Sequence, residues 1–167
     1  MIDTIGDIWR NNAWKFPAEE AWVLGKTRIT YAEHFGRCQR IASGIHKLGV
    51  RLQDRVAVLS QNTREFMELY TAAELSGYIV ATVNWRLAVP EMLWILTDSL
   101  PKVLCFEAQY TDAVDRMRGE LPHVENYICF GGPAPDWALS YEEVVATGDA
   151  KGAPQRPAPD DLLHIIY

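Results

Sequence analysis

The segment from Asp54 to Leu87 constrains the fold of this chain most strongly, because all of its local signals indicate one unit. Residues 55–60 form an apolar run rich in β-branched side chains, which is typical of a strand buried on both faces. Apolar residues then recur at helical spacing until Gly77, which can end a helix by taking a positive φ. A second apolar run, 78–83, follows directly. A strand, a helix and a strand over so few residues predict a right-handed crossover between parallel strands.

The start of the helix in this unit carries a capping signal. Asn62 is a residue type that accepts hydrogen bonds from the first turn of a helix, and Glu65 stands three positions later. We therefore expect Asn62 to cap the helix and the Glu65 side chain to bond back to the backbone N–H of Asn62.

The alternation of strand and helix continues through the rest of the chain. Short apolar runs predict strands at 102–106, 126–130 and 161–167, the last of them buried. Helices are expected at 90–98, at 111–120, and from a cap at Ser140 to Val145. Residues 148–159, rich in Gly, Pro and small polar residues, indicate an exposed connector. The predicted fold class is α/β, with a mostly parallel sheet flanked by helices on both faces.

The first fifty residues are organised differently. Residues 2–15 carry apolar side chains at near-helical spacing, and the runs 20–24 and 28–30 on either side of Gly25 predict a small hairpin. Thr30 and Glu33 have the spacing of a capping box and begin a long amphipathic helix that Gly49 closes. We therefore divide the chain into residues 1–50, with a helix, a hairpin and a long helix, and residues 51–167, which form the parallel α/β sheet.

Composition restricts the partners and the compartment. The net charge is −6 and Lys and Arg are scattered singly, which argues against binding to nucleic acid or to an anionic membrane surface. The sequence contains no apolar run long enough to span a bilayer. The three cysteines are odd in number and have no short metal-ligand spacing, so we expect free thiols in a reducing compartment, the cytoplasm.

Motifs for other chemistries are absent from the sequence. It contains no dinucleotide-binding glycine pattern, no P-loop, no H-E-x-x-H and no paired C-x-x-C. Gly131-Gly132 follows a predicted strand, but the prolines after it remove amide donors, so a loop is expected there rather than a phosphate site. The four dispersed histidines are expected to be surface or half-buried residues, and no catalytic residue and no metal ligand are predicted.

The central unit and its surroundings resemble the amino-terminal region of the adenylate-forming, AMP-binding acyl-CoA synthetases, the fatty-acid–CoA ligases. The matching residues are Ile29-Thr30-Tyr31-Ala32-Glu33, Leu48-Gly49-Val50, Asp54-Arg55-Val56, Asn62, Glu65-Phe66, Ala72-Ala73, Leu75, Gly77, Val83-Asn84 and Arg86-Leu87. The resemblance implies the front part of a ligase that joins a carboxylic acid to CoA with ATP and Mg²⁺, releasing AMP and pyrophosphate.

Two site residues follow from this resemblance. In the family, a Tyr at the position of Tyr167 opens the segment that wraps the ATP phosphates, so these residues are expected to be the truncated beginning of a longer enzyme, inactive alone because the catalytic motifs lie beyond Tyr167. Many members carry Asn-x-Arg-Leu where this chain has Asn84 to Leu87, and in some the Arg contacts a phosphate of CoA. Arg86 is the candidate here; pairing with an acid or packing on Trp85 is the alternative.

Two further functions remain open from the sequence alone. An independent α/β domain could bind a small molecule at its strand ends. The other is a structural role, in which the first helix and its Trp residues pair two subunits as a homodimer. A reading frame that continues past Tyr167 with Thr-Ser-Gly favours the ligase over both.

Overall fold

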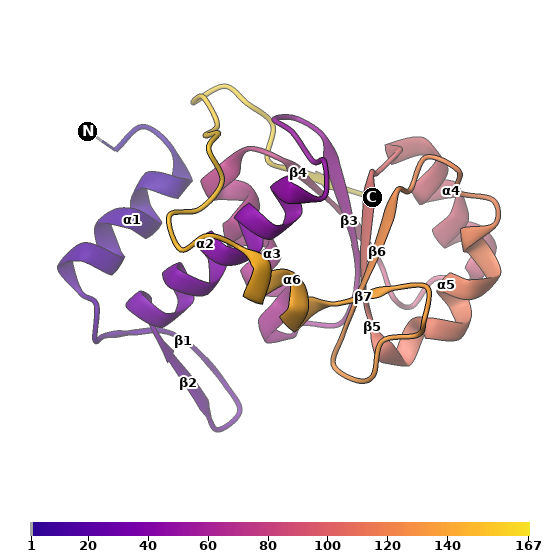
Figure 1. Cartoon of the computed structure of the whole chain (residues 1–167), viewed down its shortest axis with the longest axis horizontal. Helices are drawn as coiled ribbons and strands as arrows, with labels where there is room; N and C mark the ends of the chain where they lie inside the picture. The colour runs from indigo at the N-terminus through magenta and orange to yellow at the C-terminus, as the bar shows by residue number, and fades with distance from the viewer. Residues whose placement is uncertain (1) are drawn as a thin grey trace.

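The computed structural model describes residues 2–167, and its main feature is a six-stranded sheet in which every pair of neighbours is parallel. The strands are β3 (Arg55–Leu59), β4 (Ile79–Val83), β5 (Val103–Glu107), β6 (Asn126–Phe130), β7 (Leu139–Ser140) and β8 (His164–Ile166), in the spatial order β7-β6-β5-β3-β4-β8. Helices cover both faces, with α2 (Tyr31–Lys47), α3 (Arg64–Ser76) and α6 (Tyr141–Thr147) on one and α4 (Val89–Ser99) and α5 (Thr111–Arg118) on the other (Figure 1). The predicted α/β class is confirmed.

Strand β3 lies in the middle of the sheet and is buried on both sides. Its side chains alternate between two apolar clusters: Val56 and Val58 join the cluster under α2, α3 and α6, and Ala57 and Leu59 join the one under α4 and α5. All four are fully buried. Burying a Val or Leu side chain stabilises a fold by about 1.5–3 kcal/mol, so both faces of this strand contribute to the core.

The β3–α3–β4 crossover is present as predicted, but its helix begins one residue later than expected. Thr63, not Asn62, is the N-cap, because its hydroxyl accepts the N–H of Phe66 at 3.2 Å. With the helix starting at Arg64, Glu65 falls one position short of the place a reciprocal bond requires. The expected end is confirmed, since Gly77 takes a φ of 78°.

The amino-terminal elements also match the sequence pattern. They are α1 (Ile5–Lys15), the antiparallel hairpin β1 (Glu20–Leu24) and β2 (Thr27–Thr30), and then α2. The capping box at the start of α2 is confirmed, with Thr30 accepting from the Glu33 backbone and Glu33 accepting from the Thr30 backbone. Helix α1 lies outside the sheet layers and packs on α2 and α3 (Figure 1).

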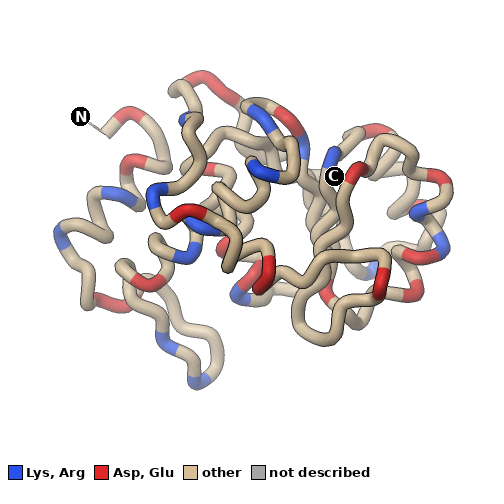
Figure 2. Tube along the Cα trace, viewed as in Figure 1, with Lys and Arg blue, Asp and Glu red and all other residues tan. Residues whose placement is uncertain are grey.

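A buried carboxylate joins three helices on one face. The Glu68 side chain is 0% exposed and pairs with Arg37 at 2.8 Å and with Arg64 at 2.7 Å. The Tyr141 hydroxyl donates to the same carboxylate at 3.0 Å. These partners come from α2, α3 and α6, so the charge of Glu68 is compensated where water is excluded. Acidic and basic residues are interspersed along the rest of the trace (Figure 2).

The last strand differs from its prediction as a buried strand. Strand β8 spans only His164–Ile166 and occupies the sheet edge, where β4 is its one neighbour among residues 2–167. Ile166 is 78% exposed and Leu162 is also exposed. The composition of an apolar run does not show whether the strand will be central in the sheet or at its edge. The sequence therefore predicted more burial than β8 has. A second difference is the short strand β7, which the sequence did not indicate and which pairs with β6.

One histidine was wrongly expected at or near the surface. His34 is fully buried, where its Nδ1 accepts from the indole N–H of Trp22 at 3.0 Å. Because Nδ1 accepts, Nε2 carries the proton and donates to the Thr71 hydroxyl at 3.0 Å. Burial lowers the pKa of His34 from 6.5 to about 4, more than the nearby Glu68 carboxylate raises it. The histidine ties the hairpin to α2 and α3.

His34 should make the stability of the fold depend on pH. The unfolded chain binds a proton at His34 below pH 6.5 and the folded chain only near pH 4, so stability falls as pH drops through this window. Between pH 7 and pH 5 the loss should be about 2 kcal/mol. Urea unfolding of the wild type and of His34→Gln measures it, because glutamine keeps a donor and an acceptor but does not titrate. An equal loss in both proteins would contradict the prediction.

Candidate functional site at the carboxyl edge of the sheet

Polar side chains gather where β3, β4 and β8 end. The carboxyl ends of parallel strands meet at one edge of a sheet, and ligands of such folds bind in the crevice outside that edge. Here a pocket of about 270 Å³ lies between these strand ends and α3. Its lining residues are Ser60, Asn62, Phe66, Tyr70, Thr82, Val83, Asn84, Trp85, Ile166 and Tyr167. Aromatic rings thus stand beside amide and hydroxyl groups, a combination that suits a ligand with apolar and polar parts.

A tight turn follows β4 and presents Arg86. The N–H of Leu87 donates to the carbonyl of Asn84 at 3.1 Å, and the N–H of Arg86 donates to the Asn84 side-chain oxygen at 3.0 Å. Arg86 is exposed, and its guanidinium lies over the indole of Trp85, 4.0 Å from the ring centroid. Within residues 2–167 no acid pairs with Arg86, so the stacked guanidinium keeps its N–H donors for another partner.

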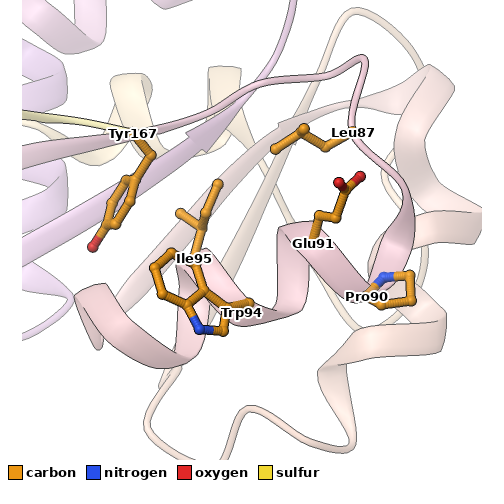
Figure 3. Close-up of a pocket in the computed structure, with 6 residues that line it drawn as sticks. All are labelled: Leu87, Pro90, Glu91, Trp94, Ile95 and Tyr167. Atoms are coloured by element: carbon orange, nitrogen blue, oxygen red, sulfur yellow. The ribbon is translucent and has the colours of Figure 1, made fainter.

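Tyr167 lies between two pockets of this edge. Its hydroxyl donates to the Asp98 carboxylate at 2.7 Å, and its ring meets Trp94 edge-on at 6.0 Å. Burial, with the Asp98 carboxylate, raises the pKa of Tyr167. The second pocket, of about 390 Å³, is lined by Leu87, Pro90, Glu91, Trp94, Ile95 and Tyr167. Figure 3 shows Tyr167 on one side of this pocket and Leu87, Glu91 and Pro90 on the other, with Ile95 and Trp94 between them. Both predicted site residues therefore stand at the same edge, each just after one of two adjacent strands.

Glu107 is a part of this edge that the sequence did not single out. It ends β5, and its carboxylate accepts from the backbone N–H of Gln61 at 3.2 Å and from the amide of Gln109 at 2.7 Å. The loop after β3 is thus fastened to the neighbouring strand. An acid just after a buried run at the carboxyl end of a parallel strand was the available signal.

Residues 2–167 hold no group of three or more His, Cys, Asp or Glu side chains that could bind a metal ion. The described cysteines Cys38, Cys105 and Cys129 are free and buried, and burial raises the pKa of each thiol.

No helix of residues 2–167 combines the length and apolarity needed to cross a membrane.

The structure is an α/β protein with a parallel sheet, helices on both faces, and a pocket at the carboxyl ends of the strands, where ligands bind in such folds. Comparison with known families is more specific, because the AMP-binding enzyme family matches residues 9–167. The chain belongs to that family, which confirms the resemblance to adenylate-forming acyl-CoA synthetases.

The curated relatives are CoA ligases. A long-chain-fatty-acid–CoA ligase of Thermus thermophilus is 33% identical over 160 residues, covering 88% of this chain and 30% of the relative. A long-chain-fatty-acid–CoA ligase of Mycobacterium tuberculosis is 32% identical over 170 residues, covering 99% of this chain and 32% of the relative. The chain therefore spans about a third of the length of these relatives.

Solved structures agree with this assignment. A fatty acyl CoA synthetase of Mycobacterium tuberculosis superposes with a TM-score of 0.88 at 30% identity, covering 99% of this chain and 32% of the other. An anthranilate CoA ligase bound to anthranoyl-AMP has a TM-score of 0.90 at 20% identity, covering 96% of this chain and 31% of the other, and shows the common fold.

The contact between Tyr167 and Asp98 can be measured in a double-mutant cycle. Because both side chains are largely exposed, we expect Tyr167→Phe and Asp98→Ala each to cost about 1 kcal/mol or less in unfolding free energy. Their effects should be coupled by about 0.2–1 kcal/mol, since either change removes the same bond. Additive effects in urea unfolding would show that the hydroxyl does not hold α4 in solution.

Proposed function

We propose that this chain is the amino-terminal portion of an ATP-dependent carboxylate–CoA ligase. The reaction takes an acid, ATP and CoA to acyl-CoA, AMP and pyrophosphate through an acyl-adenylate. The observation that carries the proposal is the family match over residues 9–167, supported by relatives that are CoA ligases with 32–33% identity.

The chemistry explains why such an enzyme needs ATP. A thiol cannot displace oxide from a carboxylate, so the acid must first receive a good leaving group. Attack of the carboxylate on the α-phosphorus of ATP forms the acyl-adenylate and releases pyrophosphate. The CoA thiol then attacks the acyl carbon and AMP departs with the bonding electrons. Both steps develop charge that prearranged donors must stabilise.

Arg86 is the proposed contact for a phosphate of CoA. A guanidinium binds phosphate oxygens in pairs through its planar fork of donors, and stacking on an aromatic ring fixes the plane of that fork. The stacked arrangement over Trp85 and the lack of an acidic partner within the described residues support this role. Packing on Trp85 alone is the competing explanation.

Tyr167 is the proposed first residue of the segment that wraps the ATP phosphates. Its position at the carboxyl end of β8, next to β4, supports this role, because that edge is where phosphates bind in such sheets. The remaining phosphate donors and the Mg²⁺ ligands would lie outside these residues, so we expect residues 1–167 to be inactive alone. The division at residue 50 and a location in the cytoplasm stay predictions.

The assay that tests the proposal is AMP release. The protein encoded by the whole reading frame, supplied with ATP, Mg²⁺ and CoA, should release AMP on addition of carboxylic acids of some chain length, and residues 1–167 should not. An AMP yield no higher than that without acid, across short, long and aromatic acids, would remove the ligase assignment. A reading frame that ends at Tyr167 would remove it as well.

Arg86→Ala in the complete enzyme tests the CoA contact. We expect the KM for CoA to rise about tenfold or more while the KM for ATP stays within about twofold, because a charge-assisted hydrogen bond to phosphate contributes about 1.5–3 kcal/mol. Arg116→Ala is the matched control, an exposed arginine on α5 without an ion pair among the described residues. An unchanged KM for CoA would show that Arg86 does not contact CoA and only packs on Trp85.

A further inference from the structure

A small cavity among the helices of the α1 side is lined by three cationic residues and by no acid. It lies between α1, α2, the end of α3 and the connector that follows α6, with a volume of about 30 Å³. The lining residues are Arg10, Gln39, Ala42, Leu75, Ser76, Lys151, Gly152, Ala153 and Arg156. A water-sized particle needs roughly 10–15 Å³ of such space, so the cavity holds about two waters or one small ion.

Arg10 is held in position at this cavity. One terminal nitrogen pairs with Asp7 at 3.0 Å, and the other donates to the carbonyl of Leu75 at 3.2 Å. Its side chain is 23% exposed, so both contacts form in a partly desolvated place. The guanidinium is thus fixed between α1 and the end of α3 rather than free to turn toward water.

The connector brings two further cations to the same place. Gln39 of α2 donates to the backbone carbonyl of Lys151 at 3.3 Å, and the Lys151 N–H donates to Asp149 at 2.8 Å. Gly152 takes a φ of 84°, which turns the chain back against α2. Among residues 2–167 neither the Lys151 ammonium nor the Arg156 guanidinium has an ion pair or a hydrogen-bond acceptor.

The acids near this cavity lie outside its lining. Asp7 pairs with Arg10, and Asp3 and Asp7 line a neighbouring pocket together with Arg10 and Arg156. Burial lowers the pKa of Arg10, and the like charge of Arg156 lowers it further. Arg10, Lys151 and Arg156 line this cavity without an acid in the lining. Their like charges repel one another, and an anion between them would relieve that repulsion.

We propose that Arg10, Lys151 and Arg156 form a binding site for a small inorganic anion. The bound anion accepts hydrogen bonds from the cations and fastens the connector to α1, α2 and α3. This site lies at the end of α3 that precedes β4, away from the carboxyl edge where we place the ligase substrates, so the inference does not depend on the proposed function. Figure 2 shows the basic segments of the connector on the side of the molecule that carries α1.

Thermal unfolding of the 167-residue chain tests the site. Sodium chloride or sodium phosphate replaces sodium gluconate at constant ionic strength, because gluconate is too large for the cavity. The Tm should rise saturably, by roughly 3–5 °C at ten times the dissociation constant. A response to chloride identifies a monatomic anion, and a response to phosphate alone identifies an oxyanion. A Tm that is the same in all three salts overturns the proposal.

Substitutions locate the effect. Arg156 and Lys151 are exposed, so Arg156→Gln and Lys151→Gln should fold, and each should reduce the anion-dependent rise in Tm by at least half. Arg116→Gln, which removes an exposed arginine on α5, should keep the full rise. A full response in both connector variants, or a loss as large in Arg116→Gln, would show that the anions act on the general charge of the protein rather than at this cavity.

Discussion

The burial of β3 on both faces is the constraint on which the rest of the structure depends. Its backbone bonds β4 on one side and β5 on the other, and its side chains enter two separate apolar clusters. A strand in that position must be covered by helices above and below, because neither face can meet water without a large loss of hydrophobic stabilisation. The crossovers through α3 and α4 supply those covers and keep neighbouring strands parallel.

The helix layers on the two faces of the sheet are held together by different interactions. Under α4 and α5 the packing is apolar, whereas α2, α3 and α6 are also joined by the buried Glu68 and its partners Arg37, Arg64 and Tyr141. Removing one partner of such a network leaves an uncompensated charge, which makes the relative placement of the three helices more specific than apolar contact alone. Helix α3, so fixed, forms one wall of the pocket at the carboxyl edge.

The two candidate sites have different properties. The carboxyl edge of the sheet combines aromatic rings, amides and an exposed arginine, which suits a ligand with apolar and polar parts. Around the end of α3, three cationic residues line a much smaller space. An anion there would stabilise the connector that leads to β8 and Tyr167, so the cavity contributes to holding the strand at which the proposed phosphate segment begins.

The sequence by itself determined the parallel α/β class, the crossover ending at Gly77, the cap at Thr30 and the family, because apolar periodicity, turn residues and motif order are local properties. It also put Arg86 and Tyr167 at strand ends, although their roles stay predictions. Only the tertiary structure decided that Thr63 caps α3, that β8 is an edge strand, that His34 is buried, and that Arg10 and Arg156 line one cavity. These features depend on contacts between distant segments, and a local pattern does not specify which segments meet.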